Sequence, residues 1–198
     1  MKSKRIMLGL LLGWLLAMAD AASIAFVPQT GQTSTLPLDP APTGSDGNLQ
    51  KGEAWPVPRF VGDASANCIT DKLTGLMWVR DLNTVNGGNT LDWNTALTMA
   101  ANGNWCGYND WRVPNINELR SLANFGVVSS ATWLNTPIAD GGGGFSNIQL
   151  QSFYWSSTSS ASDATMTWCV NVDTGIFGAG ALKVNASYYR LLPVRGGQ

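Results

Sequence analysis

The stretch "CGYNDWRVPNINELRSL", residues 106–122, joins a turn to the start of a helix. Asn115 stands three residues before Glu118, which is the spacing of a capping box, and Pro114 favours an extended entry. Apolar residues then recur at helical spacing until a glycine ends the run: Ile116, Leu119, Leu122, Ala123 and Gly126. The stretch therefore predicts a short helix whose first turn is fixed by its own side chains.

Trp111 and Arg112 lie just before this helix and allow two interpretations. An indole face stacks on the C–H groups of a sugar ring, and a guanidinium forks onto hydroxyls or carboxylates. A Trp before a helix start is more commonly a buried core residue, and an Arg beside it more commonly acts as a clasp, that is, a side chain that ties the neighbouring loop in place by bonding its carbonyls. We predict the structural role for the motif and keep Arg112 as a candidate ligand residue.

The segments upstream predict a hairpin and another helix. Two apolar runs, 68–70 and 76–79, flank a loop that ends in Gly75, as in a β-hairpin. In "LDWNTALTMAANG", residues 91–103, Asp92 fits an N-cap and Gly103 follows the last turn of an amphipathic helix.

Downstream of Thr132 the pattern changes to strands and turns. The glycine run 141–144 indicates a mobile or ligand-draped loop. Side chains alternate in "SFYWSSTSS" (152–160) and in "TMTWCVNVDTGIF" (165–177), where Asp173-Thr174-Gly175 predicts a turn, and "SYYRLLPVRGG" (187–197) is typical of a last strand. A hairpin, two short helices, a long loop and antiparallel strands together predict an α+β fold.

The two ends of the chain have different compositions. Lys2, Lys4 and Arg5 precede the apolar run 6–16 and a small-residue cleavage pattern, which predicts a signal peptide over residues 1–19. That run is shorter than the roughly 20 residues of a membrane-spanning helix. We therefore expect an exported protein, periplasmic, cell-surface or secreted, with no stable membrane insertion after cleavage.

The rest of the chain divides into an arm and a domain. Residues 20–58 are rich in Pro, Gly and Thr and predict an extended arm, whose end Trp55 and Phe60 anchor. Residues 59–198 are expected to form one folded domain, because a chain of 198 residues with 44% apolar content closes a single core.

Charge and composition exclude several classes of function. Signal cleavage leaves nine basic residues against 13 acidic ones, a net charge of −4, which disfavours nucleic acid and anionic membranes as partners. The absence of His removes Ser-His-Asp and Cys-His catalysis. The sequence has only two glutamates, Glu53 and Glu118. A glycosidase with paired catalytic carboxylates would therefore have to use aspartates on loops. We predict no enzymatic activity and no cofactor or metal. The alternative to turn capping is Ca²⁺ bound by oxygens of Asp110, Asp163, Asp173, Asn109 and Asn171.

Three cysteines, Cys68, Cys106 and Cys169, predict one disulfide and one remaining thiol in an exported chain. Their spacing leaves the pairing open.

Several motifs occur in the order seen in the Lcl C-terminal domain family, the C-terminal domain of a bacterial collagen-like adhesin. They are "TDKLTGLMW" (70–78), "CGYNDWRVPNINELRSL" (106–122), "YWSST" (154–158), "WCVNVDTG" (168–175) and "YRLLPVRGG" (189–197). The chain resembles this family over about residues 29–197, and its layout is similar to the wider C-type lectin-like group, which includes the sulfatase-modifying factors. The resemblance implies a C-type lectin-like fold, with two short helices and a twisted antiparallel sheet with long loops.

The resemblance also bears on the disulfide and on binding. Family members often pair a Cys before "TDxxTGLMW" with one before "GxxDWR", which implies a Cys68–Cys106 disulfide here. The founding adhesin's domain implies binding of sulfated polysaccharide and a trimer. No collagen-like repeat precedes the domain in this sequence, and the mature chain is acidic, so we do not carry heparin-like binding over and leave a homo-oligomer open.

The late strands supply the candidate binding surface, because rigid rings and adaptable hydrogen-bonding groups together are typical of binding surfaces. The same composition fits the solvent-facing side of an antiparallel sheet. The candidate ligand residues are Tyr154, Ser156, Asn171, Asn185, Tyr188, Tyr189 and Arg112. We predict an exported, non-enzymatic, adhesin-like recognition domain that binds a carbohydrate or cell-surface ligand. The alternatives are a structural or assembly subunit of a bacterial envelope complex, and a weak hydrolase.

Overall fold

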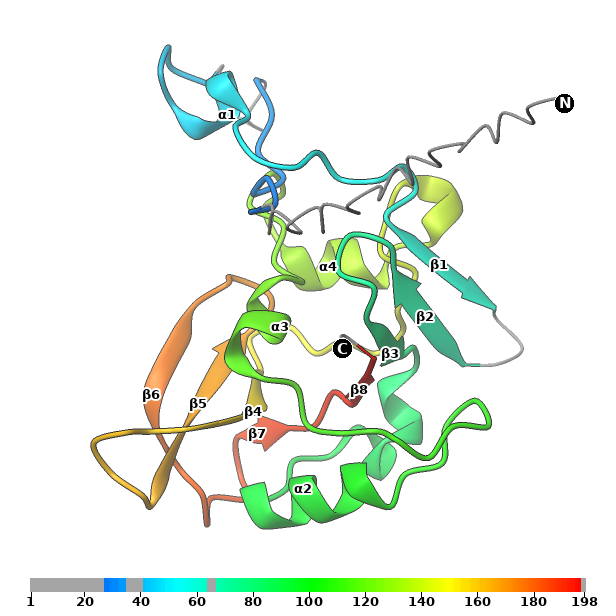
Figure 1. Ribbon diagram of the computed structural model, residues 1–198, viewed down its shortest axis with the longest axis vertical. Helices are drawn as coiled ribbons and strands as arrows, with labels where there is room; N and C mark the ends of the chain where they lie inside the picture. The colour runs from blue at the N-terminus through cyan, green and yellow to red at the C-terminus, as the bar shows by residue number, and fades with distance from the viewer. Residues whose placement is uncertain (1–26, 35–40, 64–66, 197–198) are drawn as a thin grey trace, which may run out of the picture.

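Two four-stranded sheets lie side by side in the computed structural model, which describes residues 27–34, 41–63 and 67–196 (Figure 1). The first sheet has the order β1-β2-β3-β8, with β1 (Phe60–Asp63), β2 (Cys68–Asp71), β3 (Met77–Val79) and β8 (Val194–Arg195). The second has the order β6-β5-β4-β7, with β4 (Phe153–Ser159), β5 (Met166–Asn171), β6 (Phe177–Leu182) and β7 (Tyr189–Arg190). The last strand of the chain thus completes the sheet that the first strand begins.

Short helices connect and flank the sheets. They are α1 (Asp46–Leu49), α2 (Trp93–Ala101), α3 (Ile116–Arg120) and α4 (Ser130–Asn135), with 3₁₀ turns at Leu82–Thr84, Asn86–Gly88 and Ile138–Asp140. The two helices expected from the sequence form with the expected N-caps, but α3 ends at Arg120, before the predicted run to Ala123 is complete. Asp92 accepts a hydrogen bond from the Thr95 N–H at the start of α2, and Asn115 and Glu118 make the reciprocal capping box of α3. The α+β prediction is confirmed.

Both hairpins turn through the same five-residue design. Gly75 N–H bonds the carbonyl of Asp71 at 2.8 Å, and Gly175 N–H bonds that of Asn171 at 2.9 Å. Each glycine has a positive φ, which residues with a Cβ adopt only with strain. The Asp71 carboxylate and the Asn171 amide oxygen then accept the backbone N–H two residues on. The two predicted hairpins, β2–β3 and β5–β6, are therefore confirmed together with the residues that form their turns.

The second sheet is covered on both faces along β4 and β5. Tyr154 and Val170 belong to a core cluster with Trp78 and the α3 residue Leu119, whereas Trp155 belongs to another cluster with Ala96 and Ala100 of α2 and with Trp111. Because the side chains of a strand alternate between its two faces, successive residues of β4 enter different cores. This leaves the middle of the sheet without a solvent-facing side.

The single twisted antiparallel sheet expected from the resemblance is wrong in two respects. There are two sheets, and β4 pairs with β7 in parallel. The expected last strand is divided into β7 and β8. Between them, Leu191 is buried in the cluster around Trp155, and Leu192 is buried in the cluster around Trp78. The chain therefore crosses from one sheet to the other between β7 and β8, and Pro193 in this crossing has no N–H to donate to a sheet.

The segment around the glycine run contains a helix, α4, that the sequence pattern did not predict. Gly142, Gly143 and Gly144 are buried, and the N–H groups of Gly143 and Gly144 bond the carbonyls of Trp133 and Thr136. A Cβ on Gly142 would lie 2.3 Å from the Thr136 oxygen, and one on Gly143 would lie 2.8 Å from the Leu134 Cα. The glycines are therefore required for close packing against α4.

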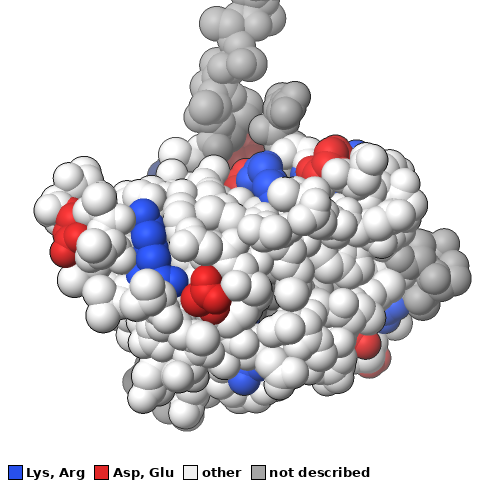
Figure 2. All heavy atoms as spheres, turned by 90° about the horizontal axis from the view of Figure 1, so that it is seen from below, with Lys and Arg blue, Asp and Glu red and all other residues white. Residues whose placement is uncertain are grey.

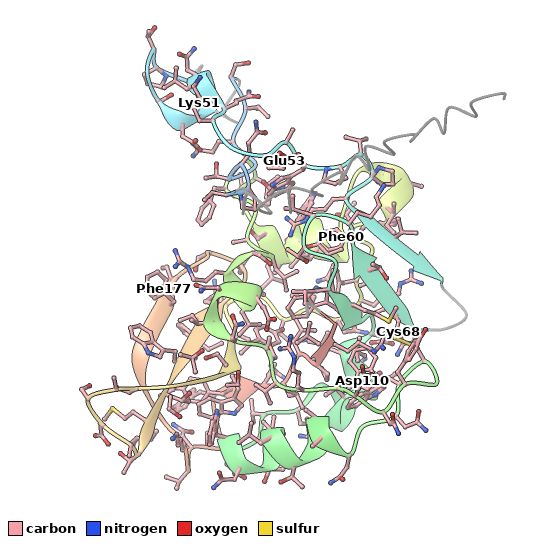
Figure 3. All side chains as sticks on the ribbon, in the orientation of Figure 1. Lys51, Glu53, Phe60, Cys68, Asp110 and Phe177 are labelled. Atoms are coloured by element: carbon pink, nitrogen blue, oxygen red, sulfur yellow. A yellow bond between two sulfur atoms is a disulfide. The ribbon has the colours of Figure 1, made fainter. Side chains whose placement is uncertain are left out.

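Cys68 and Cys106 form the disulfide that the resemblance implied, and Cys169 is a buried free thiol (Figure 3). Burial raises the pKa of the Cys169 thiol to about 11. The predicted signal peptide, residues 1–19, lies outside the described residues. Within the described part of the chain, no helix has the length and apolar character that crossing a membrane requires.

Candidate functional site

The described part of the arm folds back on itself and lies against the segment that joins α3 to α4. Gln29 N–H bonds the Glu53 carbonyl at 2.9 Å, and the Trp55 indole N–H bonds the Gln29 carbonyl at 2.8 Å. The Phe125 N–H then donates to the Thr30 carbonyl at 3.0 Å. Figure 1 shows this part of the chain at the end of the molecule opposite α2. The arm is thus docked by backbone hydrogen bonds as well as by the predicted anchors Trp55 and Phe60.

A cleft of about 660 Å³ opens where the arm meets the domain. We call it the arm cleft. Its lining combines aromatic and aliphatic side chains with two polar ones and exposed backbone: Gly31, Trp55, Pro56, Val57, Pro58, Arg59, Asn124, Trp133, Ile138, Ala139, Gly141 and Gly142. A concave, mostly apolar site with a few convergent polar groups is typical of a small-molecule or glycan site.

Trp55 and Trp133 form an aromatic pair in the arm cleft, with ring centroids 5.6 Å apart. The Trp133 indole N–H is bonded to the Gly141 carbonyl at 3.0 Å, and its ring also packs 5.7 Å from Phe60. Both indoles are only partly buried. Two rings held in place by hydrogen bonds offer an apolar surface that loses little conformational entropy when a ligand binds.

Arg59 forms the charged floor of the arm cleft. Its Nε and Nη2 bond the two oxygens of the fully buried Asp71 at 2.9 and 2.7 Å, and Nη2 also bonds the Ser121 carbonyl. The guanidinium carbon lies 4.4 Å from the centre of the Trp55 ring. Arg59 therefore joins the first hairpin turn to the arm and fixes the orientation of Trp55.

Three candidate ligand residues from the late strands are buried, which corrects the expected surface. Tyr154 and Ser156 have no exposed area, and Asn171 is 7% exposed. Tyr154 faces the core around Trp78, where burial raises its pKa to about 12, and its hydroxyl accepts the Gln149 N–H. Asn171 caps the second hairpin turn. The alternation suggested a solvent-facing side, but both faces of this sheet are packed.

The other candidate ligand residues do not meet in one place. Tyr188 is 69% exposed, and Asn185 caps its own turn by accepting the Ser187 N–H. Tyr189 packs 4.1 Å from the Trp155 ring. Arg112 makes two hydrogen bonds of 2.7 Å to Glu118 and one of 3.0 Å to the Gly196 carbonyl.

The arrangement of Arg112 matches the predicted clasp. Hydrogen bonding to Glu118 raises the pKa of the Arg112 guanidinium, and the Glu118 carboxylate also accepts the Asn115 N–H of the capping box. Trp111 is 3% exposed, as the core interpretation predicted.

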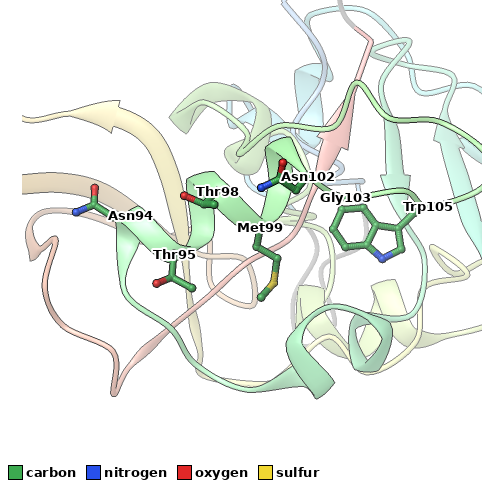
Figure 4. A pocket seen from close by; sticks show the side chains of 7 residues that line it. All are labelled: Asn94, Thr95, Thr98, Met99, Asn102, Gly103 and Trp105. Atoms are coloured by element: carbon green, nitrogen blue, oxygen red, sulfur yellow. The ribbon is translucent and has the colours of Figure 1, made fainter.

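A second hollow, of about 560 Å³, lies on the outer side of α2 (Figure 4). We call it the α2 hollow. Its lining comes from one helix and the turn that follows: Asn94, Thr95, Thr98, Met99, Asn102, Gly103 and Trp105. Figure 2, seen from below Figure 1, shows charged side chains as isolated spots on a mostly uncharged face. The α2 hollow has one wall and an ordinary polar helix surface, so the arm cleft is the better-formed site.

The aspartates considered for Ca²⁺ have other partners. Asp110 bonds Arg195 at 2.6 Å, which lowers the pKa of its carboxyl, and Asp163 bonds Thr165, which lowers the pKa likewise. Asp173 accepts from Ser129 and from the Ala131 N–H at the start of α4. In the ranges that the structure describes, no three His, Cys, Asp or Glu side chains are grouped to hold a metal ion.

Sequence reasoning missed Trp133, Asn124 and Arg59 as site residues. Trp55 was expected only to anchor the arm. Prolines stiffen an extended segment, so an aromatic residue among them can also form a rigid wall of a binding site. The residues that form the opposite wall are distant in sequence and carry no shared motif. Their proximity follows from the docking of the arm.

Comparison with known proteins identifies the domain but leaves the arm outside the match. The family model of the Lcl C-terminal domain matches residues 67–195. No curated protein matches the chain significantly. One wall of the arm cleft, with Asn124 and Trp133, lies within the matched residues, and the other, with Gly31 and Trp55, precedes them.

Proposed function

This chain belongs to the Lcl C-terminal domain family, and we propose that it is an exported, non-enzymatic recognition protein that binds a carbohydrate in the arm cleft. The observation that carries the proposal is the pair of partly buried indoles, Trp55 and Trp133, facing a cleft with two polar side chains. Sugar rings present C–H faces to aromatic rings, and their oxygens bond a few fixed polar groups.

Two further features support this proposal. Among the residues that the structure describes, the lining of the arm cleft includes no Asp or Glu, so this lining lacks the paired carboxylates of a glycosidase. The one cation of the described lining, Arg59, already bonds Asp71 through both carboxylate oxygens, so the lining favours an uncharged sugar over a sulfated one. An adhesin-like role agrees with the resemblance to the collagen-like adhesin's domain.

Export to the periplasm, the cell surface or the medium is part of the proposal. The Cys68–Cys106 disulfide supports it, because such crosslinks persist in oxidising compartments. We also propose that the domain has a C-type lectin-like topology. The pairing of β8 with β3 supports this, because it brings the two ends of the domain together.

The test is a glycan array with the mature chain, residues 20–198, followed by Kd measurements for Trp55→Ala. We expect binding to a defined glycan class, and loss of the Trp55 ring should raise Kd roughly 10- to 100-fold because it removes one stacking wall. Trp105→Ala is the matched control in the α2 hollow and should change Kd by less than about threefold. Failure of every glycan to bind, or a larger loss from Trp105→Ala, would refute the proposed site.

A further inference from the structure

Two residues of the arm cleft have hydrogen-bond donors without partners. Asn124 is 8% exposed, and its side-chain oxygen accepts the Gly126 N–H at 2.9 Å. Among the described residues, no hydrogen bond uses the two N–H groups of the Asn124 Nδ2. The Nη1 of Arg59 also has no partner in the described structure and is fully buried, whereas the Asn124 Nδ2 is not among the fully buried unpaired atoms. The Asn124 amide is therefore open to solvent at the cleft and is free to donate to a ligand.

Two acceptors of the same cleft are already engaged. The Gly141 carbonyl accepts the Trp133 indole N–H, and the Asn124 oxygen accepts the Gly126 N–H. The Asn124 oxygen is the only side-chain acceptor among the described lining residues, whereas the Asn124 Nδ2 is a side-chain donor that a ligand acceptor can use. The complementary ligand group is a hydrogen-bond acceptor.

The charges and the apolar side chains of the cleft limit which kind of acceptor group it can bind. The bidentate pair with Asp71 engages the Arg59 charge, and the exposed Asp140 lies between the lining residues Ala139 and Gly141. An anionic carboxylate is therefore disfavoured at this site. Aliphatic side chains, Val57 and Ile138 among them, also line the cleft and favour a ligand group that carries a methyl. An acetamido group combines a neutral carbonyl acceptor with such a methyl.

We propose that the arm cleft selects sugars that carry an N-acetyl group. The acetamido carbonyl accepts from the Asn124 Nδ2, its methyl packs on the aliphatic wall, and the sugar ring stacks on the indole pair. Arg59 packs against the Trp55 ring, with its guanidinium carbon 4.4 Å from the ring centre, and holds the ring in position for stacking. This inference rests on the proposed carbohydrate binding and adds the chemical class of the sugar.

The test compares three β-1,4-linked tetrasaccharides by calorimetry on the mature chain: N-acetylglucosamine, its deacetylated glucosamine form, and glucose. We expect the acetylated sugar to bind at least roughly tenfold more tightly than either of the others, because only it brings a carbonyl to the Asn124 donor and a methyl to the aliphatic wall. Asn124→Asp keeps the oxygen that accepts the Gly126 N–H and removes the Nδ2 donor, so it should abolish the preference. Asn94→Asp, on α2, should leave it unchanged.

The outcomes separate the inference from the proposed function. Equal affinity for the acetylated sugar and the glucose tetrasaccharide would overturn the selectivity while leaving carbohydrate binding in place, and this comparison needs no variant. An acetyl preference that survives in folded Asn124→Asp would overturn the assignment to Asn124. Absence of binding to all three, together with an empty glycan array, would overturn both.

Discussion

Replacement of Gly126 by alanine is expected to detach the arm and to weaken glycan binding at least roughly tenfold, because one wall of the arm cleft is then lost. A Cβ on Gly126 would lie 2.0 Å from the Gly31 carbonyl oxygen, which is a severe steric clash. Gly126 does not have a positive φ, so alanine fits its own backbone; the severe clash falls on the arm, and the Asn124 side-chain oxygen makes a milder close contact at 3.2 Å. Binding is measured by calorimetry, and arm docking by proteolysis between residues 27 and 58.

The matched control is Gly178→Ala on β6. A Cβ there meets nothing within 4 Å, and the backbone is again compatible with alanine. This variant should bind glycan like the wild type and resist proteolysis equally well. If Gly126→Ala binds normally while its arm is cleaved, the arm is not a wall of the binding site.

Removal of the disulfide by Cys68→Ala with Cys106→Ala is expected to have the largest effect on stability. The crosslink spans a sequence separation of 38 residues. The chain entropy that it removes from the unfolded state corresponds to ~4 kcal/mol in the free energy of unfolding. This is a large fraction of the stability of an ordinary domain. Urea unfolding without reductant measures the difference.

Cys169→Ala is the control for loss of a cysteine without loss of a crosslink. Cys169 is 5% exposed and its thiol contacts only the Gly178 carbonyl among hydrogen-bond partners in the described residues. Its truncation should cost about 1 kcal/mol from lost packing. A double variant no less stable than Cys169→Ala would contradict the stabilising role of the disulfide.

The local features of the fold were predictable because each depends on residues a few positions apart. Asn115 and Glu118 each accept the other's backbone N–H, and Asp71 with Gly75 closes a turn of five residues. Such interactions form wherever the chain carries those residues in that order. The helix starts and hairpin turns therefore followed from the sequence.

The features that were missed depend on what packs against each element. Tyr154 and Asn171 have the alternation of a half-exposed strand, but α2, α3 and the first sheet cover both faces. Burial of this kind is set by tertiary contacts, so it cannot be read from the alternation of side chains along the strand. The glycine run was expected to be a loop at a ligand. Gly141 and Gly142 do line the arm cleft, but Gly142 and Gly143 pack closely on α4 and its C-terminal end, and the sequence pattern did not predict that helix.

The arm cleft could not be predicted because its walls come from segments far apart in the chain. Gly31 and Trp55 meet Asn124 and Trp133 only after the arm docks through Thr30 on Phe125. No motif spans these positions.

The most direct test of this account is a crystal structure of the mature chain with the tightest-binding glycan from the array. We expect a sugar ring stacked on the exposed indole surface of the Trp55–Trp133 pair, with one of its oxygens within hydrogen-bond distance of the Asn124 Nδ2. A glycan seated in the α2 hollow or at the Tyr188 turn, with the arm cleft empty, would contradict the account.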